Sequence, residues 1–354
     1  MALIKNLMME GSGMGPTMTD VAREAGVGLA TVDRVINKRA SVSQETAERV
    51  LAAAEKLGFR RASLIRDRLD ERTAGYRLGF ILQKSSTHFY SELGSVLEAT
   101  TRTQMQPAGK ALVAFLDELT PEHVVAKLYE LSKKVDAIAL VAADHPLVSQ
   151  AIDDITARGI PVFALISDLT AVSCSGYVGI DHRKVGRTAA WAISTISPAP
   201  GKVGVIVGSH RYLCQEQSEM SFRSYFREFA PQFQVLETLI SLEDIHLAQS
   251  ATLELLKQHP DLTGIYIAGG GIEGVLQALK DGNPPPGLVT VCLDLTTVTR
   301  QALIERRINM VLSHPQEWLA SRLVEAMVTA IQDKAARGSL QNSLPFITYT
   351  PANV

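Results

Sequence analysis

The stretch "TMTDVAREAGVGLATVDRVIN", residues 17–37, predicts two helices joined by a tight turn. Thr17 begins the first helix, because Asp20 three residues later can complete a capping box with it. Gly26 ends that helix, since glycine readily adopts the left-handed conformation of a helix end. The second helix spans roughly residues 29–37 and turns its branched apolar side chains to one face. This arrangement is typical of a helix-turn-helix, whose second helix enters the major groove of DNA.

A third helix and a local basic charge follow this stretch. Ser43 begins the third helix and Gly58 ends it. Between Arg34 and Arg68 there are nine Lys and Arg against four Asp and Glu, although the whole chain has a formal charge of −2. Such a patch supplies the counterion release that drives binding to DNA phosphates. A three-helix protein-interaction module with a solvated basic face is the alternative. The apolar residues that repeat at helical spacing are Ala47, Val50, Leu51, Ala54 and Leu57.

Residues 17–58 resemble the DNA-binding headpiece of the LacI/GalR transcription regulators. The resemblance implies a homodimer on a palindromic operator, with the start of the second helix reading bases. Arg34 suits this role, because its guanidinium can donate to O6 and N7 of a guanine together. The DNA-contacting residues that the resemblance implies are Thr17, Leu29, Ala30, Thr31, Arg34, Asn37, Arg66 and Leu69.

Two positions of the headpiece depart from the family pattern, which usually has Ser at both. Gly28 offers no hydroxyl to a phosphate. Asp33 would repel a phosphate, so it orients Arg34, accepts from a cytosine amino group, or is a solvated acid.

The hinge, residues 59–75, also departs from the pattern. Arg61 and Ala62 stand where the family has Pro and Asn. Arg68 occupies the position of the leucine that wedges into the minor groove, and Leu69 follows one residue late. The hinge therefore either inserts Leu69 or follows phosphates and a narrow minor groove without unstacking a base step.

The composition favours a soluble cytoplasmic protein of two or three domains. Of its 354 residues 46% are hydrophobic, and no apolar run approaches the roughly 20 residues of a membrane span. Cys174, Cys214 and Cys292 show no metal-binding spacing, which favours a reducing compartment and predicts no metal or other cofactor. Residues 1–16 have no periodic apolar face, so we expect a disordered tail.

Residues 76–354 alternate short β-branched runs with helix-length segments, which predicts an α/β fold with parallel sheets. So many strands suggest two lobes, with the chain crossing between them near Asp181, His314 and Gly338. This pattern resembles the periplasmic-binding-protein type I domain that follows the headpiece in the same family, which implies a two-lobed effector-binding and dimerisation domain. The candidate strands lie within residues 77–83, 111–117, 137–143, 161–167, 202–208, 234–240, 264–269, 289–294 and 309–314.

Polar and aromatic residues follow the candidate strands, where ligands of open parallel sheets bind. Their mixture suits a sugar, since aromatic rings stack on its C–H face while carboxylates and imidazoles bond its hydroxyls. Ser218 stands where the family commonly has an arginine, and Arg183 and Arg211 are the candidate substitutes. The predicted effector-binding residues are His88, Phe89, Tyr90, Asp144, Ser167, Asp168, Asp181, Gly270, Gly271, Asp294 and His314, with His145 and His182 beside them.

Residues 263–282, "TGIYIAGGGIEGVLQALKDG", contain the G-x-G-x-x-G of a dinucleotide-binding enzyme, and Asp294 stands where its ribose-binding acid would be. That motif belongs at the first strand of a nucleotide-binding sheet, and too little chain follows it here. We interpret the glycines as part of the effector cleft and the chain as a ligand-responsive repressor, not an enzyme. The alternatives are a structural tight turn and a nucleotide-dependent sugar-modifying or dehydrogenase enzyme with an accessory DNA-binding arm.

Overall fold

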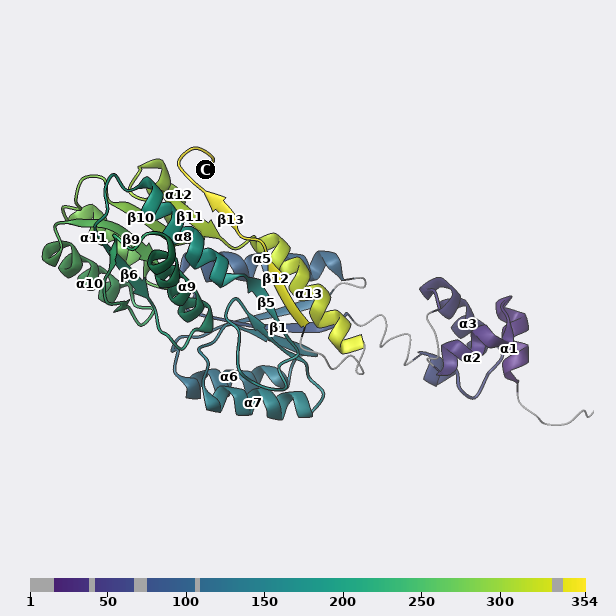
Figure 1. The fold of residues 1–354 in the computed structure, drawn as a ribbon. Coiled ribbons are helices and arrows are strands. Elements are labelled where there is room, and N and C mark those ends of the chain that lie inside the picture. Colours follow the sequence, from purple (N-terminus) through teal and green to yellow (C-terminus); the bar gives the residue numbers. More distant parts are fainter. Residues whose placement is uncertain (1–15, 38–41, 67–74, 106–108, 333–339) are drawn as a thin grey trace, which may run out of the picture. The chain divides into compact units, whose positions relative to one another are not determined.

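The computed structural model describes residues 16–37, 42–66, 75–105, 109–332 and 340–354 (Figure 1). The chain divides into two compact units, Met1–Gly75 and Tyr76–Val354. The predicted tail, apart from Pro16, lies outside the described residues, as do Leu69 and Gly338.

The first unit contains three helices, α1 (Met18–Ala25), α2 (Leu29–Asn37) and α3 (Gln44–Lys56). Thr17 and Asp20 form the predicted capping box of α1, and Gly26 closes this helix with a φ of 63°. Arg49 of α3 donates to the backbone oxygen of Ala25 over 2.7 Å, which satisfies a carbonyl at the end of α1. The buried residues shared by the helices are Val21, Ala22, Ala25, Val32, Val35, Ile36, Ala47, Val50, Ala53, Ala54 and Ile65.

The second unit begins with a parallel sheet in the order β12-β5-β4-β3-β1-β2. Helices α6 and α7 pack against one face of this sheet, and α5 and α13 pack against the other. The strands are β1 (Arg77–Leu82), β2 (Lys110–Phe115), β3 (Ala137–Leu140), β4 (Val162–Leu165), β5 (Gly176–Ile180) and β12 (Leu340–Leu344). The helices are α5 (His88–Gln104), α6 (Pro121–Ser132), α7 (Pro146–Ala157) and α13 (Gln316–Gln332).

A second sheet has the order β13-β11-β10-β9-β6-β7, with β8 also paired to β6, and only β13 runs antiparallel to its neighbour. Helices α8 and α9 pack together on one face, while α10, α11 and α12 pack on the other. The strands are β6 (Lys202–Val207), β7 (Gln234–Val235), β8 (Leu239–Ile240), β9 (Leu262–Ile267), β10 (Val289–Leu293), β11 (Met310–Ser313) and β13 (Ile347–Tyr349). The helices are α8 (His182–Ile196), α9 (Leu213–Phe229), α10 (Ile245–Gln258), α11 (Ile272–Asp281) and α12 (Thr297–Ile304).

The chain passes between the two sheets three times. Two passages are as predicted: at Asp181, between β5 and α8, and at His314, between β11 and α13. The third prediction, near Gly338, is wrong, because β12 still belongs to the first sheet and the passage follows Leu344. The polar sequence of β12 gave no apolar alternation that would mark it as a strand.

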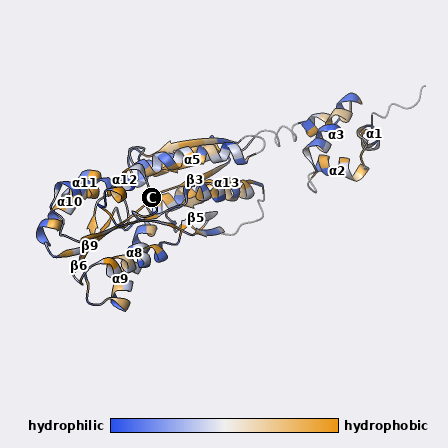
Figure 2. Ribbon diagram, turned by 90° about the horizontal axis from the view of Figure 1, so that it is seen from above, coloured by the Kyte–Doolittle hydropathy of each residue, from blue (hydrophilic) through white to orange (hydrophobic). Residues whose placement is uncertain are grey.

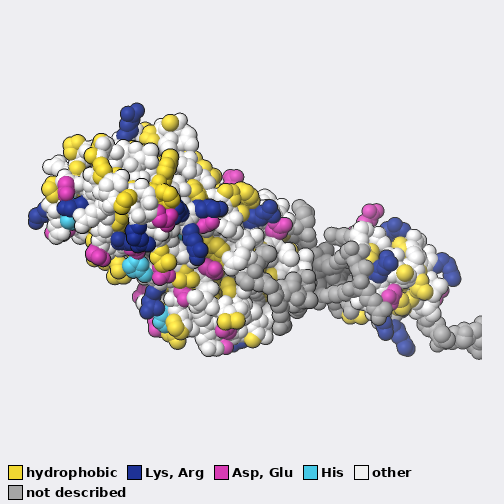
Figure 3. Space-filling model, viewed as in Figure 1, with side chains coloured by type: hydrophobic (Ala, Val, Ile, Leu, Met, Phe, Trp, Pro, Cys, Tyr) yellow, Lys and Arg dark blue, Asp and Glu magenta, His cyan; other side chains and the backbone are white. Residues whose placement is uncertain are grey.

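Apolar strands sandwiched between amphipathic helices form the core of the second unit (Figure 2). Phe80, Phe163 and Tyr266 are among its largest fully buried side chains. All three cysteines are free thiols. No helix among the described residues is long and apolar enough to cross a membrane. On the face drawn in Figure 3, basic and acidic side chains of this unit are interspersed.

We expect Gly274→Ala to destabilise the second unit. A Cβ on Gly274 would overlap the backbone oxygen of Ile245, where α11 approaches α10. Replacing a helical glycine by alanine normally gains about 0.5 to 1 kcal/mol, but overpacking costs about 1 to 3 kcal/mol, so the net change is a loss. Thermal unfolding of Gly274→Ala, with exposed Lys280→Ala on the same helix as control, measures it. A melting temperature at or above that of the wild type would contradict the close approach of the two helices.

Candidate ligand pocket and nucleic-acid interface

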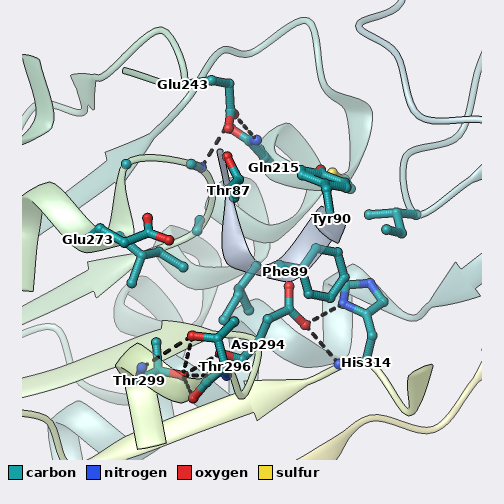
Figure 4. Close-up of a pocket in the computed structure, with 18 of the residues that line it drawn as sticks. Thr87, Phe89, Tyr90, Gln215, Glu243, Glu273, Asp294, Thr296, Thr299 and His314 are labelled. Carbon is teal, nitrogen blue, oxygen red and sulfur yellow. Dashed lines mark hydrogen bonds and ion pairs between the residues drawn. The ribbon is translucent and has the colours of Figure 1, made fainter. Parts of the chain in front are cut away.

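A pocket in the second unit is lined from the carboxyl ends of strands of both sheets (Figure 4). The first lobe contributes Phe89 and Tyr90 from α5, and the second contributes His182 from α8 together with Asp294 and His314, which follow β10 and β11. The empty space of the pocket, including its open mouth, is about 670 Å³. The topology therefore gathers residues far apart in sequence into one site for a small ligand.

Asp294 and His314 form a buried pair at the base of the pocket. The Nδ1 of His314 lies 2.7 Å from Oδ1 of Asp294, and the backbone N–H of His314 donates to the same oxygen over 3.0 Å. Because a carboxylate only accepts hydrogen bonds, Nδ1 carries the proton in this contact. Thr299 donates to the backbone oxygen of Asp294 over 2.8 Å, which fixes the loop that positions the carboxylate.

His182 lies beside this pair, with its ring centroid 5.7 Å from that of His314. Its Nε2 lies 3.0 Å from the carbonyl oxygen of Ile166 and therefore carries the proton. Burial, followed by repulsion from His314, lowers the pKa of His182 to about 3, so the ring is neutral near pH 7. Phe89 packs 5.7 Å from His314 and 5.1 Å, edge to face, from Tyr90, which gives the pocket an aromatic wall.

Glu243 occupies the opposite side of the pocket, after β8. Its Oε1 accepts from Gln215 over 2.7 Å and from the backbone N–H of Gly270 over 3.3 Å. A Cβ at Gly208 or at Gly270 would overlap the Glu243 carboxylate, so a larger residue at either position would displace this side chain. Burial raises the pKa of Glu243 above its ordinary value, against the hydrogen bond from Gln215.

Three lining residues have backbone conformations that non-glycine residues rarely adopt. Ile166, Glu243 and Asp294 have φ values of 65°, 56° and 59°, and for β-branched isoleucine this is a genuine outlier. Each residue follows the last residues of a strand and turns its side chain at the pocket. Strained residues cluster at functional sites, where the surrounding fold holds them.

Six of the eleven predicted effector-binding residues line the pocket: Phe89, Tyr90, Gly270, Gly271, Asp294 and His314. His88 does not line the pocket, but its Nδ1 lies 3.7 Å from the carboxylate of Glu273, which does. Ser218 is bonded to the Tyr266 hydroxyl inside the core. The candidate substitute arginines, Arg183 and Arg211, are exposed and do not line this pocket.

The other four predicted residues stabilise neighbouring loops. Asp144 accepts from the backbone and hydroxyl of Thr170, and Asp181 caps α8 by accepting from the N–H groups of Arg183 and Lys184. Their role as effector contacts stays a prediction. The two remaining residues are Ser167, whose hydroxyl accepts from the N–H of Cys214, and Asp168, whose carboxylate accepts from the N–H of Leu169.

The sequence analysis missed Gln215, Glu243 and Glu273, which also line the pocket. Glu243 could have been found, because it follows the candidate strand at residues 234–240 by three residues. Glu273 lies inside the glycine motif, which was interpreted only through its glycines. No sequence pattern marks Gln215 as a pocket residue, because its place at the pocket depends on how α9 packs beside β6. Among the described residues, no cluster of three or more His, Cys, Asp or Glu is arranged to hold a metal ion.

The first residues of α2 form an exposed face on the helical unit. Leu29, Ala30 and Arg34 are all exposed, with Leu29 49% accessible although it is apolar. Asn37 donates to Asp33 over 2.6 Å, so this acid is engaged along its own helix. Arg66 pairs with Glu55 over 2.6 Å. The Lys and Arg side chains visible on this unit in Figure 3 accord with the local basic charge.

The buried neutral His182 makes stability depend on pH. In the unfolded chain the imidazole titrates near 6.5, whereas in the fold it resists protonation until about pH 3. As pH falls below 6.5 the unfolded state binds a proton that the folded state does not, so stability is present above 6.5 and is lost on acidification. The titration of His182 therefore lowers the free energy of unfolding by about 2 kcal/mol between pH 6.5 and 5, at about 1.4 kcal/mol per pKa unit.

His182→Gln keeps an amide donor toward Ile166 and removes the titration. We expect urea unfolding of this variant to lose about 2 kcal/mol less than wild type between pH 6.5 and 5. His246→Gln, an exposed histidine on α10, is the control. Equal losses in wild type and His182→Gln would show that this ring is not held neutral by burial.

Comparison with known proteins identifies two families along the chain. Residues 17–62 match the bacterial regulatory proteins of the lacI family, and residues 78–335 match the periplasmic binding protein domain. These ranges correspond to the helical unit and to the greater part of the two-sheet unit.

Relatives and solved structures agree with this assignment. The ribose operon repressor of Halalkalibacterium halodurans is 28% identical over 258 residues, covering 71% of this chain and 70% of that protein. The transcriptional regulator GalS of Salmonella typhimurium is 25% identical over 283 residues, covering 75% of each. A solute-binding protein of Agrobacterium vitis bound to alpha-D-tagatopyranose shares the fold with a TM-score of 0.71 at 19% identity, covering 79% of this chain and 96% of that one. With a helix-turn-helix and a periplasmic-binding-protein domain in one polypeptide, the chain belongs to the lacI family of bacterial transcriptional regulators.

Proposed function

We propose that this regulator binds a palindromic operator as a cytoplasmic homodimeric repressor, and that a sugar-like metabolite in the pocket changes its operator affinity. One observation carries the proposal: a single chain joins a helix-turn-helix with an exposed recognition face to a pocket lined from two sheets. The relatives support it, since one is a ribose operon repressor and one similar structure holds alpha-D-tagatopyranose.

The pocket geometry supports an allosteric mechanism. A ligand that contacts Phe89 of the first lobe together with Asp294 and His314 of the second makes differential contacts in the open and closed arrangements of the lobes. Such a ligand shifts the balance between the two arrangements, and through this balance it changes operator affinity. The loops at Asp181 and His314, where the chain crosses between the sheets, are the natural hinges.

The dehydrogenase alternative finds little support in the glycine motif. The N–H of Gly270 already donates to Glu243, and Gly274 is required by the approach of α10. Acidic Glu243 and Glu273 would repel a pyrophosphate at this turn. A thermal shift on adding NAD(H) or NADP(H), larger than that given by any sugar, would support the dehydrogenase alternative.

We expect Arg34→Ala to weaken operator binding by about 1 to 3 kcal/mol and to relax the preference at one base pair in each half-site, because one bidentate guanine contact is lost. Binding-site selection followed by titration at fixed salt measures both effects. Lys133→Ala, an exposed cation in the second unit, is the control. The same motif and affinity for Arg34→Ala and wild type would refute the assignment of α2 as the recognition helix.

We expect Asp294→Asn to weaken effector binding about ten- to a hundredfold, the equivalent of one charge-assisted hydrogen bond of roughly 1.5 to 3 kcal/mol. The amide keeps the shape but loses the charge that His314 and the ligand hydroxyls contact. Operator titrations with increasing effector give the midpoint, and DNA binding without effector should barely change.

Asp168→Asn is the matched control, because Asp168 also follows a strand but does not line the pocket. Equal midpoints for Asp294→Asn and wild type would remove Asp294 from the site. A loss as large in Asp168→Asn would instead place the effector elsewhere.

A further inference from the structure

The polar groups of the pocket are dominated by hydrogen-bond acceptors. Three carboxylates line it, those of Glu243, Glu273 and Asp294, and the described lining residues include no Lys or Arg. In Figure 4 these carboxylates approach the pocket from different sides. A ligand that fills the pocket and excludes water must therefore satisfy acidic groups that no lining cation neutralises.

Two buried histidine nitrogens add to this surplus of acceptors. His182 and His314 are each 3% exposed, and in each ring one nitrogen already uses its proton, toward Ile166 and Asp294 respectively. The other nitrogens, Nδ1 of His182 and Nε2 of His314, have no hydrogen-bond partner. Buried polar groups are nearly always satisfied, so unpartnered nitrogens on two lining residues point to a partner that the protein itself does not supply.

Positive charge near the pocket is sparse and peripheral. Lys84 acts on Glu243 electrostatically without being a lining residue. His88 approaches Glu273 to 3.7 Å from a half-exposed position at the rim. Asp294 accepts from the Nδ1–H of His314. Removing carboxylates from water without a paired charge is costly, so an incoming cation is favoured and an incoming anion is opposed.

The helix ends at the pocket supply the complementary donors. Thr87 begins α5 without a side-chain cap, so the first N–H groups of this helix remain available to a ligand oxygen. At α11 the N-terminal dipole is offset by Glu273 in the first turn, which leaves this end little attraction for an anion. Ring hydroxyls, which both donate and accept, fit this arrangement, and the Phe89 and Tyr90 wall fits the apolar face of a ring.

We propose that the pocket selects a polyhydroxylated ligand carrying a protonated amine, an amino sugar or aminated polyol, and rejects phosphorylated or carboxylated sugars. This inference rests on the proposed function and names the chemical class of its effector. The ammonium compensates the carboxylates, while the hydroxyls donate to the two unpartnered imidazole nitrogens and accept from the start of α5.

Matched sugars test the proposal with the full-length protein. The probes are D-glucosamine, D-galactosamine and D-mannosamine, each beside its parent hexose and the hexose 6-phosphate. Titration calorimetry at pH 7 gives the affinity for each. We expect at least one amino sugar to bind at least tenfold more tightly than its parent, and no phosphate to bind more tightly than its parent. A parent hexose or a phosphate that binds as tightly as the best amine overturns the proposal, as does the absence of binding by all three amines.

A variant separates charge recognition from general damage. Glu273→Gln removes one carboxylate, which pairs with His88 at the rim. We expect the preference for the amine over its parent hexose to fall about tenfold in Glu273→Gln, while affinity for the parent stays within about threefold. Glu254→Gln, an exposed acid on α10, is the control and should keep the full preference. An unchanged preference in Glu273→Gln and also in Glu243→Gln would show that these carboxylates do not read the amine.

Operator binding by the same samples distinguishes this inference from the proposed function. A neutral hexose that binds best and changes operator affinity leaves the proposed function standing and refutes the amine. An amine preference in a protein that binds no selected operator supports the inference and refutes the proposed function.

Discussion

The contact between Asp294 and His314 is the constraint on which the pocket depends. Asp294 ends β10 and His314 ends β11, so their bond joins two neighbouring strand ends of the second sheet at the point where the chain leaves for the first. Asp294 holds a left-handed backbone conformation, at a φ of 59°, that a non-glycine residue adopts only when its surroundings enforce it. The carboxylate fixes the imidazole, and the imidazole in turn packs on Phe89 of the other lobe and on His182 at the start of α8.

This constraint explains why the pocket is acidic and yet ordered. Asp294 and Glu243 each accept hydrogen bonds from groups of the protein, an imidazole and a backbone N–H in one case and an amide and a backbone N–H in the other. These hydrogen bonds orient the two carboxylates. The protein thus orients these carboxylates through its own hydrogen bonds, and a ligand is left to compensate their negative charge. A lining arginine would have fulfilled both requirements at once and favoured anionic ligands instead.

The sequence predicted the architecture better than the pocket. Helix caps and apolar periodicity are local, so Thr17, Gly26 and Ser43 gave the helical unit, and β-branched runs gave most of the strands. Strand β5, with two glycines in five residues, and the polar strand β12 lack that pattern. Their extended conformation is imposed by pairing with neighbouring strands, so it could not be predicted from their own residues. The topology determines which strand-end residues converge. Each parallel strand is followed by polar residues, but only some of these residues face the other lobe.

The same distinction applies to the DNA-binding face, where sequence shows residue types but not their existing partners. Asp33, a departure from the family pattern, accepts from Asn37 one helical turn later, and Arg66 is held by Glu55. Exposed pairs of this kind contribute little to stability and weaken with salt, so they are exchanged readily for phosphates. Under the proposed function, a phosphate would replace Glu55 as the partner of Arg66, so the electrostatic gain from this residue would be smaller than that from a cation without a partner.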